Sequence, residues 1–248
     1  MDFLIDFYSS EGKDGLTPES AISQERAQPN STIDAARMVG TIDRLTRALA
    51  NRRFLDVGCG YGVFSRCAID AGFDVLPLEL AENEREITRA QTGLDPVACT
   101  FETFESPPES FGVVFMSQVL EHAQDVNLWV GKACKLLVPG GILAVALPNF
   151  DSIFRRCMQE NEPYIIPPAH LNFFTPKSLS LLMRTHGFQV EAVQWVSRIP
   201  RDTVLKRTPF LGGAAWPVVN AGLSAVMGTL DSLRLGMIIN AYGRKHAA

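Results

Sequence analysis

The feature that most constrains this chain is a short apolar strand that runs directly into three alternate glycines. The run reads Phe54-Leu55-Asp56-Val57-Gly58-Cys59-Gly60-Tyr61-Gly62, and a helical pattern follows it as far as Ala71. Glycine accepts backbone conformations that other residues resist, and a loop without Cβ atoms lets backbone N–H groups approach a ligand closely. We therefore expect a strand–loop–helix turn whose glycines bind a small molecule.

Strand and helix patterns alternate along the rest of the chain, which predicts the fold class. Helices in this pattern alternate with short apolar strands, and crossovers between such strands are right-handed. The sequence therefore predicts an α/β fold with a mostly parallel sheet covered by helices on both faces. The expected strands are 54–57, 73–79, 96–100, 111–117, 142–147, 188–196 and 235–242, and the main expected helices are 62–71, 84–92, 126–137 and 176–186.

An acid closes the second expected strand and narrows the choice of ligand. Glu79 follows Gly60 by 19 residues, at a position where a carboxylate can accept both hydroxyls of a ribose. A dinucleotide fingerprint would need glycine or alanine where Val63 stands, and a phosphate loop would need Gly-Lys-Ser/Thr. Asp56 would repel a pyrophosphate but suits a cation. The pattern favours a ribose-bearing ligand with an ammonium or sulfonium group.

Five motifs in order resemble those of the class I S-adenosylmethionine (SAM)-dependent methyltransferases. The glycine run resembles the first motif, and Glu79 resembles the ribose-binding acid. The segment 111–122, FGVVFMSQVLEH, is similar to the fourth-strand motif, and LVPGG at 137–141 to the LkPGG turn. HLNFFTP at 170–176 is similar to the HxxFF(T/S)P segment of a bacterial small-molecule and quinone-type subgroup. The resemblance covers roughly residues 53–193 and implies a Rossmann-like, seven-stranded sheet whose last strand is antiparallel and lies at an edge of the sheet.

The same resemblance implies a set of cofactor-binding residues. Gly112 stands where the family usually has Asp, and Cys99–Glu102 replaces its adenine-binding acid, so the adenine contact is expected from Thr100 or the Phe101 backbone. The cysteines form no CxxC pair, and no metal site is expected. The residues expected to bind SAM are Asp56, Gly58, Cys59, Gly60, Glu79, Leu80, Thr100, Phe101, Ser117 and Gln118.

Two histidines are the candidates for catalysis. His122 follows Glu121 at the mouth of the fourth strand, where the resemblance implies the transferred methyl group. His170 lies in a loop after Tyr164. A histidine with an ordinary pKa near 6.5 can take a proton from an acceptor hydroxyl or amine. Two structural roles remain open: His122 as part of a helix turn, and His170 as a loop residue satisfied by backbone groups.

Composition excludes several function classes. The net charge of −4 argues against a nucleic-acid binder, which needs a basic face. The five scattered cysteines favour a reducing compartment, and the first residues lack the pattern of a signal peptide, so we expect a cytoplasmic protein. We expect a lid or helical segment over residues 1–50 and a methyltransferase domain over 51–248, with a helical insertion at about 198–233.

The insertion contains an uncharged stretch over 208–230. That length could span a bilayer, but glycines, a proline and an asparagine make its hydropathy poor. We expect a helix from about Ala214 to Leu230 with Pro217 in its first turn. We expect this helix to pack on the protein itself or on a second copy of the chain. The basic residues that precede it also suit an anionic lipid or an anionic membrane surface, which is the alternative.

The sequence thus predicts a SAM-dependent methyltransferase. The acceptor would be an oxygen, nitrogen or carbon atom of a small molecule, a glycan or a lipid-like substrate. The alternatives are an NAD-dependent oxidoreductase, against which Val63 and the glycine spacing count, and a non-catalytic SAM-binding scaffold protein.

Overall fold

The computed structural model of the chain describes residues 30–162, 169–197, 204, 208 and 216–247. At its centre lies a six-stranded sheet with the strand order β2-β1-β3-β4-β6-β5. All strands run parallel except β6, which is antiparallel to both of its neighbours. The strands are β1 (Arg53–Val57), β2 (Asp74–Leu78), β3 (Phe111–Ser117), β4 (Leu137–Pro148), β5 (Phe188–Val196) and β6 (Ile238–Lys245).

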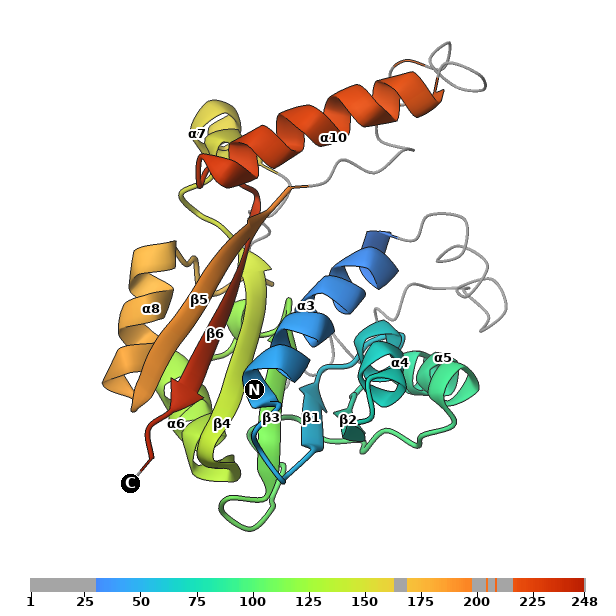
Figure 1. Cartoon of the computed structure of the whole chain (residues 1–248), viewed down its shortest axis with the longest axis vertical. Coiled ribbons are helices and arrows are strands. Elements are labelled where there is room, and N and C mark those ends of the chain that lie inside the picture. Colours follow the sequence, from blue (N-terminus) through green and yellow to red (C-terminus); the bar gives the residue numbers. More distant parts are fainter. Residues whose placement is uncertain (1–29, 163–168, 198–203, 205–207, 209–215, 248) are drawn as a thin grey trace.

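Helices cover both faces of the sheet (Figure 1). On one face α3 and α4 pack against Phe54, Phe115 and Tyr242, and on the other α6 and α8 pack against a second apolar cluster. Alternate strand residues point to opposite faces, so β1 serves both clusters. The helices are α3 (Asn30–Thr46), α4 (Val63–Asp70), α5 (Glu82–Thr92), α6 (Val126–Leu136), α7 (Ile153–Met158), α8 (Pro176–Thr185) and α10 (Trp216–Ser232), with short 3₁₀ turns η1 (Leu120–His122) and η2 (Gln159–Asn161).

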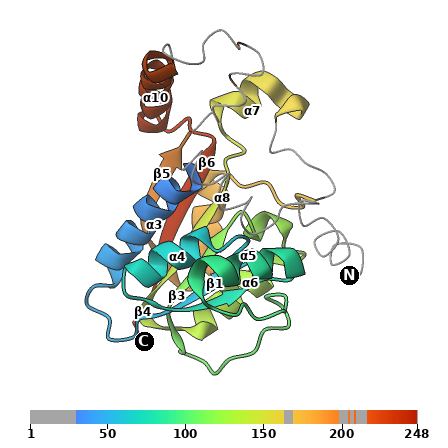
Figure 2. The same ribbon diagram turned by 90° about the vertical axis from the view of Figure 1, so that its right-hand side faces the viewer.

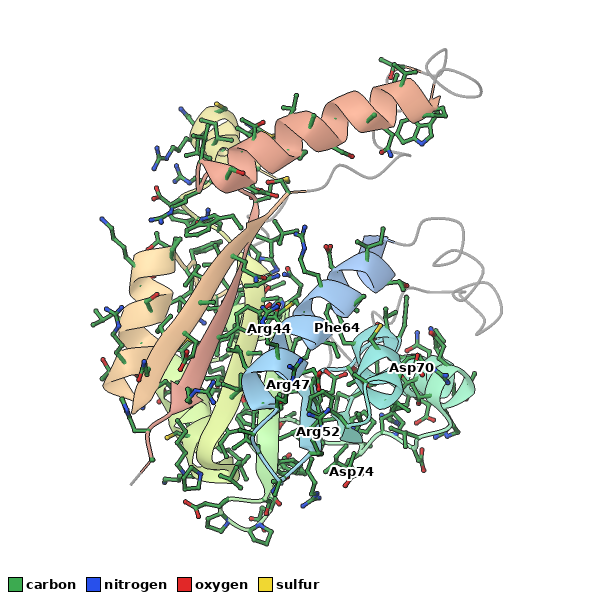
Figure 3. The ribbon with its side chains drawn as sticks, viewed as in Figure 1. Arg44, Arg47, Arg52, Phe64, Asp70 and Asp74 are labelled. Atoms are coloured by element: carbon green, nitrogen blue, oxygen red, sulfur yellow. The ribbon has the colours of Figure 1, made fainter. Side chains whose placement is uncertain are left out.

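Arg52 joins α3 to the start of the sheet. Its guanidinium donates to Asp43 of α3 at 2.8 Å and to the Ala71 carbonyl at 2.9 Å. The same group stacks 3.8 Å above the ring of Phe73. Figure 3 labels Arg52 beside β1 and below α3. The helix that precedes the first strand is therefore part of the sheet's packing.

The fold class predicted from the sequence is confirmed, with a different strand count. Residues 96–100, expected to form a strand, contribute only an isolated bridge between Leu78 and Val97. Pro96 has no N–H to donate to a ladder. The Cys99 N–H donates to the Val97 carbonyl at 3.0 Å, which closes a tight turn and ends the extended backbone. The sheet formed by the described residues therefore has six strands, where seven were expected.

The last strand also lies elsewhere than expected. It starts at Ile238, not near Leu235, because the Leu235 N–H still closes a turn onto the Leu230 carbonyl at 2.9 Å. It was expected at the edge of the sheet, but β6 is inserted between β4 and β5 and its middle residues are buried. The edge strand is β5, whose residues are mostly half-exposed. The insertion buries Ile239, Ala241 and Tyr242 of β6, although this strand also carries Arg244 and Lys245 at its end.

Two helices begin where the sequence predicted. Thr175 caps α8 by accepting the Ser178 N–H at 3.1 Å, and Pro176 is its first residue. The helix expected over 214–230 is α10, with Pro217 in its first turn. None of the described helices is long and apolar enough to cross a membrane. Of the lid or helical segment expected over residues 1–50, residues 1–29 lie outside the described residues, and the division of the chain near residue 50 stays a prediction.

Candidate active site

The glycine loop, residues 58–62, connects β1 to α4 at the carboxyl end of the sheet. Gly58, Gly60 and Gly62 all have positive φ, at 64°, 54° and 77°. A Cβ on Gly62 would lie 2.8 Å from the Thr88 Cγ2 atom, so no larger residue fits. The Thr88 hydroxyl of α5 donates to the Gly60 carbonyl at 2.6 Å. A neighbouring helix therefore holds the loop in a shape that only glycine allows.

Asp56 lies beneath this loop and is 2% exposed. Its carboxylate accepts a hydrogen bond from the Ser65 hydroxyl of α4 at 2.6 Å. Burial raises the pKa of Asp56 from 3.8 to about 7, and the Ser65 hydrogen bond opposes that rise. A buried carboxylate at the border of ionisation gains most from a nearby cation. This electrostatic setting fits a ligand that carries a positive charge.

Glu79 holds the loop to the end of β2. Its two carboxylate oxygens accept the N–H groups of Gly60 at 3.0 Å and of Ala81 at 2.9 Å. Each carboxylate oxygen has a second lone pair, which leaves room for two hydroxyl donors. Arg85 of α5 donates to the carbonyls of Glu79 and Leu80. Both expected positions, Glu79 and Leu80, are thus fixed by local hydrogen bonds.

The remaining candidates are Cys59 in the glycine loop and Thr100 and Phe101 beyond it. Cys59 is 8% exposed, and burial raises the pKa of its thiol, which disfavours the nucleophilic thiolate. A contact between Cys59 and a ligand is therefore expected from its backbone. Phe101 is buried edge-on against Trp129, with ring centroids 5.3 Å apart, and its carbonyl accepts Lys132 Nζ at 2.7 Å. Thr100 lies half-buried in a turn with Thr103.

Gly112 shows why this sequence departs from the family pattern at the start of β3. A Cβ at Gly112 would lie 2.1 Å from the Asn51 carbonyl oxygen. Contacts that short do not occur between Cβ atoms and backbone, so no aspartate can stand there. The departure is a consequence of how closely the chain before β1 passes this strand.

Ser117 and Gln118 end β3 beside the glycine loop. Gln118 has a φ of 56°, although it is not glycine. Its N–H donates to the Ala146 carbonyl of β4 at 2.8 Å, which holds the unusual backbone in place. Strained backbone of this kind costs of order 1–3 kcal/mol and gathers at functional sites. The position is therefore a strong candidate for ligand contact, as the sequence indicated.

The segment 169–174 is docked onto η1. The N–H groups of Leu171 and Asn172 both donate to the Glu121 carbonyl at 2.9 Å. The Asn172 side-chain amide donates to the Ala123 carbonyl at 2.6 Å. These bonds join the fourth-strand motif to the HLNFFTP motif. They bring His122 and His170 together, with ring centroids 4.8 Å apart and an interplanar angle of 66°.

His122, His170 and Glu121 form a compact cluster at the end of β3. The His122 Nδ1 atom lies 2.8 Å from the Ala169 carbonyl, and burial lowers the pKa of His122. Glu121 is 1% exposed, and burial raises its pKa to about 8. One ligand atom from each residue lies within 4.8 Å of the others. Within the described parts of the chain this is where a divalent cation could bind; the expectation of no metal remains a prediction.

Sequence reasoning missed the residues that support these positions. Ser65, Thr88 and Arg85 hold the first loop, while Glu121 and Asn172 hold the histidines. Ser65 and Thr88 lie on helices outside the recognised motifs, and their role depends on which group they meet after folding. Asn172 lies inside the HLNFFTP motif, but its partner, a backbone carbonyl, is brought to it only by folding. Glu121 stood inside a recognised motif but was assigned no role, because its burial cannot be seen in a sequence.

Comparisons with known proteins agree with this geometry. The pattern of a family described as a methyltransferase domain matches residues 31–193. A ubiquinone biosynthesis O-methyltransferase of Mesorhizobium japonicum is 32% identical over 120 residues, which is 46% of this chain and 48% of that protein. Its counterpart in Sinorhizobium fredii is 33% identical over 106 residues, 41% and 43% of the two chains. The chain thus spans about half the length, or less, of these curated relatives.

Solved structures share the fold at lower identity. A SAM-dependent methyltransferase of Mesorhizobium loti superposes with a TM-score of 0.55 at 20% identity, covering 82% of this chain and 96% of that one. A SAM-dependent methyltransferase of Archaeoglobus fulgidus gives a TM-score of 0.59 at 16% identity, covering 91% and 99%. The similarity extends over nearly all of each neighbour, so the six-stranded sheet and its helices form a fold that is already known.

Proposed function

This chain belongs to the methyltransferase domain family, in agreement with its class I SAM-dependent motifs, and we propose that it methylates a hydroxyl oxygen of a small aromatic acceptor. The observation that carries the proposal is the meeting of His122 and His170, 4.8 Å apart, at the end of β3. β3 pairs directly with β1, so the histidines and the glycine loop occupy the same end of the sheet. The similar O-methyltransferases of ubiquinone biosynthesis support oxygen and an aromatic ring.

The residues around the glycine loop fit SAM. A loop without Cβ atoms admits the amino-acid part of the ligand to bare backbone, and Asp56 supplies a negative charge near a cation. Glu79 retains lone pairs for the ribose hydroxyls. We assign the cofactor contacts to Asp56, Gly58, Cys59, Gly60, Glu79, Leu80, Ser117 and Gln118, and the adenine side to Thr100 and the Phe101 backbone. When bound, SAM supplies a methyl group already activated by its sulfonium.

The protein then has to align the acceptor and remove its proton. In our proposal His170 accepts the hydroxyl proton as the oxygen forms its new bond to carbon and the carbon–sulfur bond breaks. His122 lies against His170, and its Nδ1 atom, 2.8 Å from the Ala169 carbonyl, positions the backbone that carries His170. Alignment and exclusion of water account for most of the rate enhancement in reactions of this kind.

Turnover of SAM tests this function. Purified protein is incubated with methyl-labelled SAM and a set of phenols, and labelled product and S-adenosylhomocysteine are measured. We expect equal amounts of both. Hydride transfer to or from NAD would favour the oxidoreductase alternative, and SAM binding without product from any phenol, amine or carbon acid would favour a scaffold protein.

The location and the partners of the chain are also proposals. We place the protein in the cytoplasm and assign the exposed helix α10 to contact with a membrane surface. α10 is uncharged up to Asp231, and Val218 and Val226 on it are exposed. Cosedimentation with anionic liposomes measures this contact, and analytical ultracentrifugation distinguishes it from the alternative, a homodimer through the same helix.

A further inference from the structure

A hollow at the α7 end of the sheet connects the candidate base to an arginine for which the function has no use so far. Its lining includes Phe150, Arg155, His170 and Phe173. This hollow is narrow, with a volume of about 10 Å³, which is room for little more than a hydroxyl group. A second, more open hollow of about 550 Å³ shares Phe150, Arg155 and Phe173 with it, extends along α7 to Arg156, and is large enough for an aromatic ring. We call the two together the acceptor hollow. Figure 2 shows α7 and α10 beyond the same end of the sheet.

The walls of the acceptor hollow are held by main-chain bonds. Asn149 at the end of β4 forms a parallel bridge with Phe174, and the Phe150 N–H donates to the Phe174 carbonyl at 2.8 Å. The Asn149 side chain is itself fixed by the Gly236 carbonyl at 2.8 Å. The hollow is therefore a built feature of the fold that includes the HLNFFTP segment.

Aromatic rings form one side of this hollow. Phe150 and Phe173 lie with ring centroids 5.2 Å apart, tilted by 43°. Phe173 is 40% exposed although it is a large apolar side chain. An exposed ring beside a candidate base is a suitable surface on which an aromatic acceptor can stack, since offset and edge-on ring pairs are favourable.

Arg155 supplies the polar group. Its guanidinium carbon lies 4.3 Å above the Phe150 ring, which orients the group. The Arg155 Nε atom is buried and has no acceptor among the described residues. A buried donor without a partner costs about 1–3 kcal/mol, a cost that an incoming carboxylate oxygen would remove. Glu160 and Glu162 also line the hollow, so the opposite preference, for a cationic acceptor, has to be tested directly.

We propose that Arg155 binds an anionic group of the acceptor, a carboxylate carried on the same aromatic ring as the hydroxyl that faces His170. This inference deepens the proposed function and rests on it for the role of His170. The substrate class is a phenolic acid. Phe150 and Phe173 contact the ring, Arg155 forms a charge-assisted pair with the carboxylate, and His170 takes the phenolic proton.

Binding of three probes with one ring and three charges tests the proposal. The protein saturated with S-adenosylhomocysteine is titrated by calorimetry with 3,4-dihydroxybenzoate, catechol and 3,4-dihydroxybenzylamine. We expect the benzoate to bind tightest. Arg155→Gln should weaken benzoate binding by about ten- to a hundredfold and leave catechol within about twofold, since only the charge-assisted pair is lost.

Arg66→Gln is the matched control. Arg66 lies on α4, is not among the residues that line the acceptor hollow, and is an exposed arginine that pairs with Asp70 at 2.9 Å, so this variant should bind all three probes as the wild type does. Tightest binding of the benzylamine would overturn the proposal in favour of Glu160 and Glu162. Equal loss for all probes in Arg155→Gln, or no binding by any probe, would also overturn it. Because binding is measured without turnover, a benzoate preference with no methylation would refute the proposed function and not this inference.

Discussion

The glycine loop and the acceptor hollow lie at the same end of one sheet but differ in how their polar groups are satisfied. Around the loop, Asp56 pairs with Ser65, Glu79 with Gly60 and Ala81, and Thr88 with Gly60. On the other side, the described residues with buried side-chain atoms that lack a partner are Glu121, Arg155 and Trp195. Buried unpaired groups are costly, so a ligand gains most by supplying their partners. The cofactor side is preformed, whereas the acceptor side is completed by what it binds.

The largest effect expected on the acceptor side comes from His170. Replacement of His170 by glutamine should lower kcat by about 10²–10⁴-fold, because the acceptor proton loses its base. SAM affinity should stay unchanged, since the glycine loop is held independently. His186→Gln is the control: His186 is a half-buried residue that follows α8 and contacts Asn127 at 3.0 Å. A rise in KM with normal kcat would instead make His170 a positioning residue, and unchanged kinetics would remove it from the site.

On the cofactor side the largest effect comes from Glu79. Glu79→Ala should weaken SAM binding by about ten- to a hundredfold, since charge-assisted hydrogen bonds contribute roughly 1.5–3 kcal/mol. The structure adds a second cause, because the same carboxylate holds the Gly60 and Ala81 N–H groups. Calorimetry with SAM measures the effect, and Asp74→Ala, an exposed acid near the start of β2, is the control. An unchanged dissociation constant for SAM would show that Glu79 does not contribute to SAM binding.

The pH dependence of SAM binding sharpens the comparison further. The pKa of Asp56 in the folded chain is about 7, above its ordinary 3.8. A bound cation favours the carboxylate, so SAM affinity should rise by about tenfold from pH 6 to pH 8. The ligand-free fold should lose stability as the pH rises from about 4 to about 7, because the Asp56 carboxyl releases its proton at a lower pH in the unfolded chain than in the folded one. Asp56→Asn should flatten both profiles, and Ser65→Ala should move the binding midpoint to higher pH. A flat wild-type profile would contradict the assignment.

The smallest effect is expected in α10, a 17-residue helix in which only Met227 is buried. Gly228 lies in this helix with nothing within 4 Å of where a Cβ would stand. Gly228→Ala should therefore stabilise the chain by no more than about 1 kcal/mol, through helix propensity alone. Gly112→Ala, by contrast, should destabilise it strongly, because the Asn51 carbonyl occupies the space. Thermal unfolding compares the two, and a destabilising Gly228→Ala would mean that α10 packs against something there.

Much of the fold was predictable, and the reason lies in local patterning. The strands expected over 54–57 and 111–117 and the helix expected over 176–186 depend on neighbours a few residues apart, so the sequence reveals them. The prediction of a strand over 96–100 was wrong, because a proline and a tight turn override the apolar character of this segment. The prediction that the last strand lies at the edge of the sheet was wrong, because strand order depends on burial on both faces of the sheet, which a local pattern does not encode.

The sequence by itself determined the family, the glycine loop and the histidines that mark the candidate site. Those features are short motifs whose chemistry is carried by residue type and spacing. Only the tertiary structure decided what surrounds them. His122 meets the Ala169 carbonyl across 47 residues, and Asn149 meets Gly236 across 87. Whether Glu121 is buried or Arg155 lacks an acceptor depends on such distant contacts, because burial and hydrogen-bond pairing are properties of the packed chain and not of any segment within it.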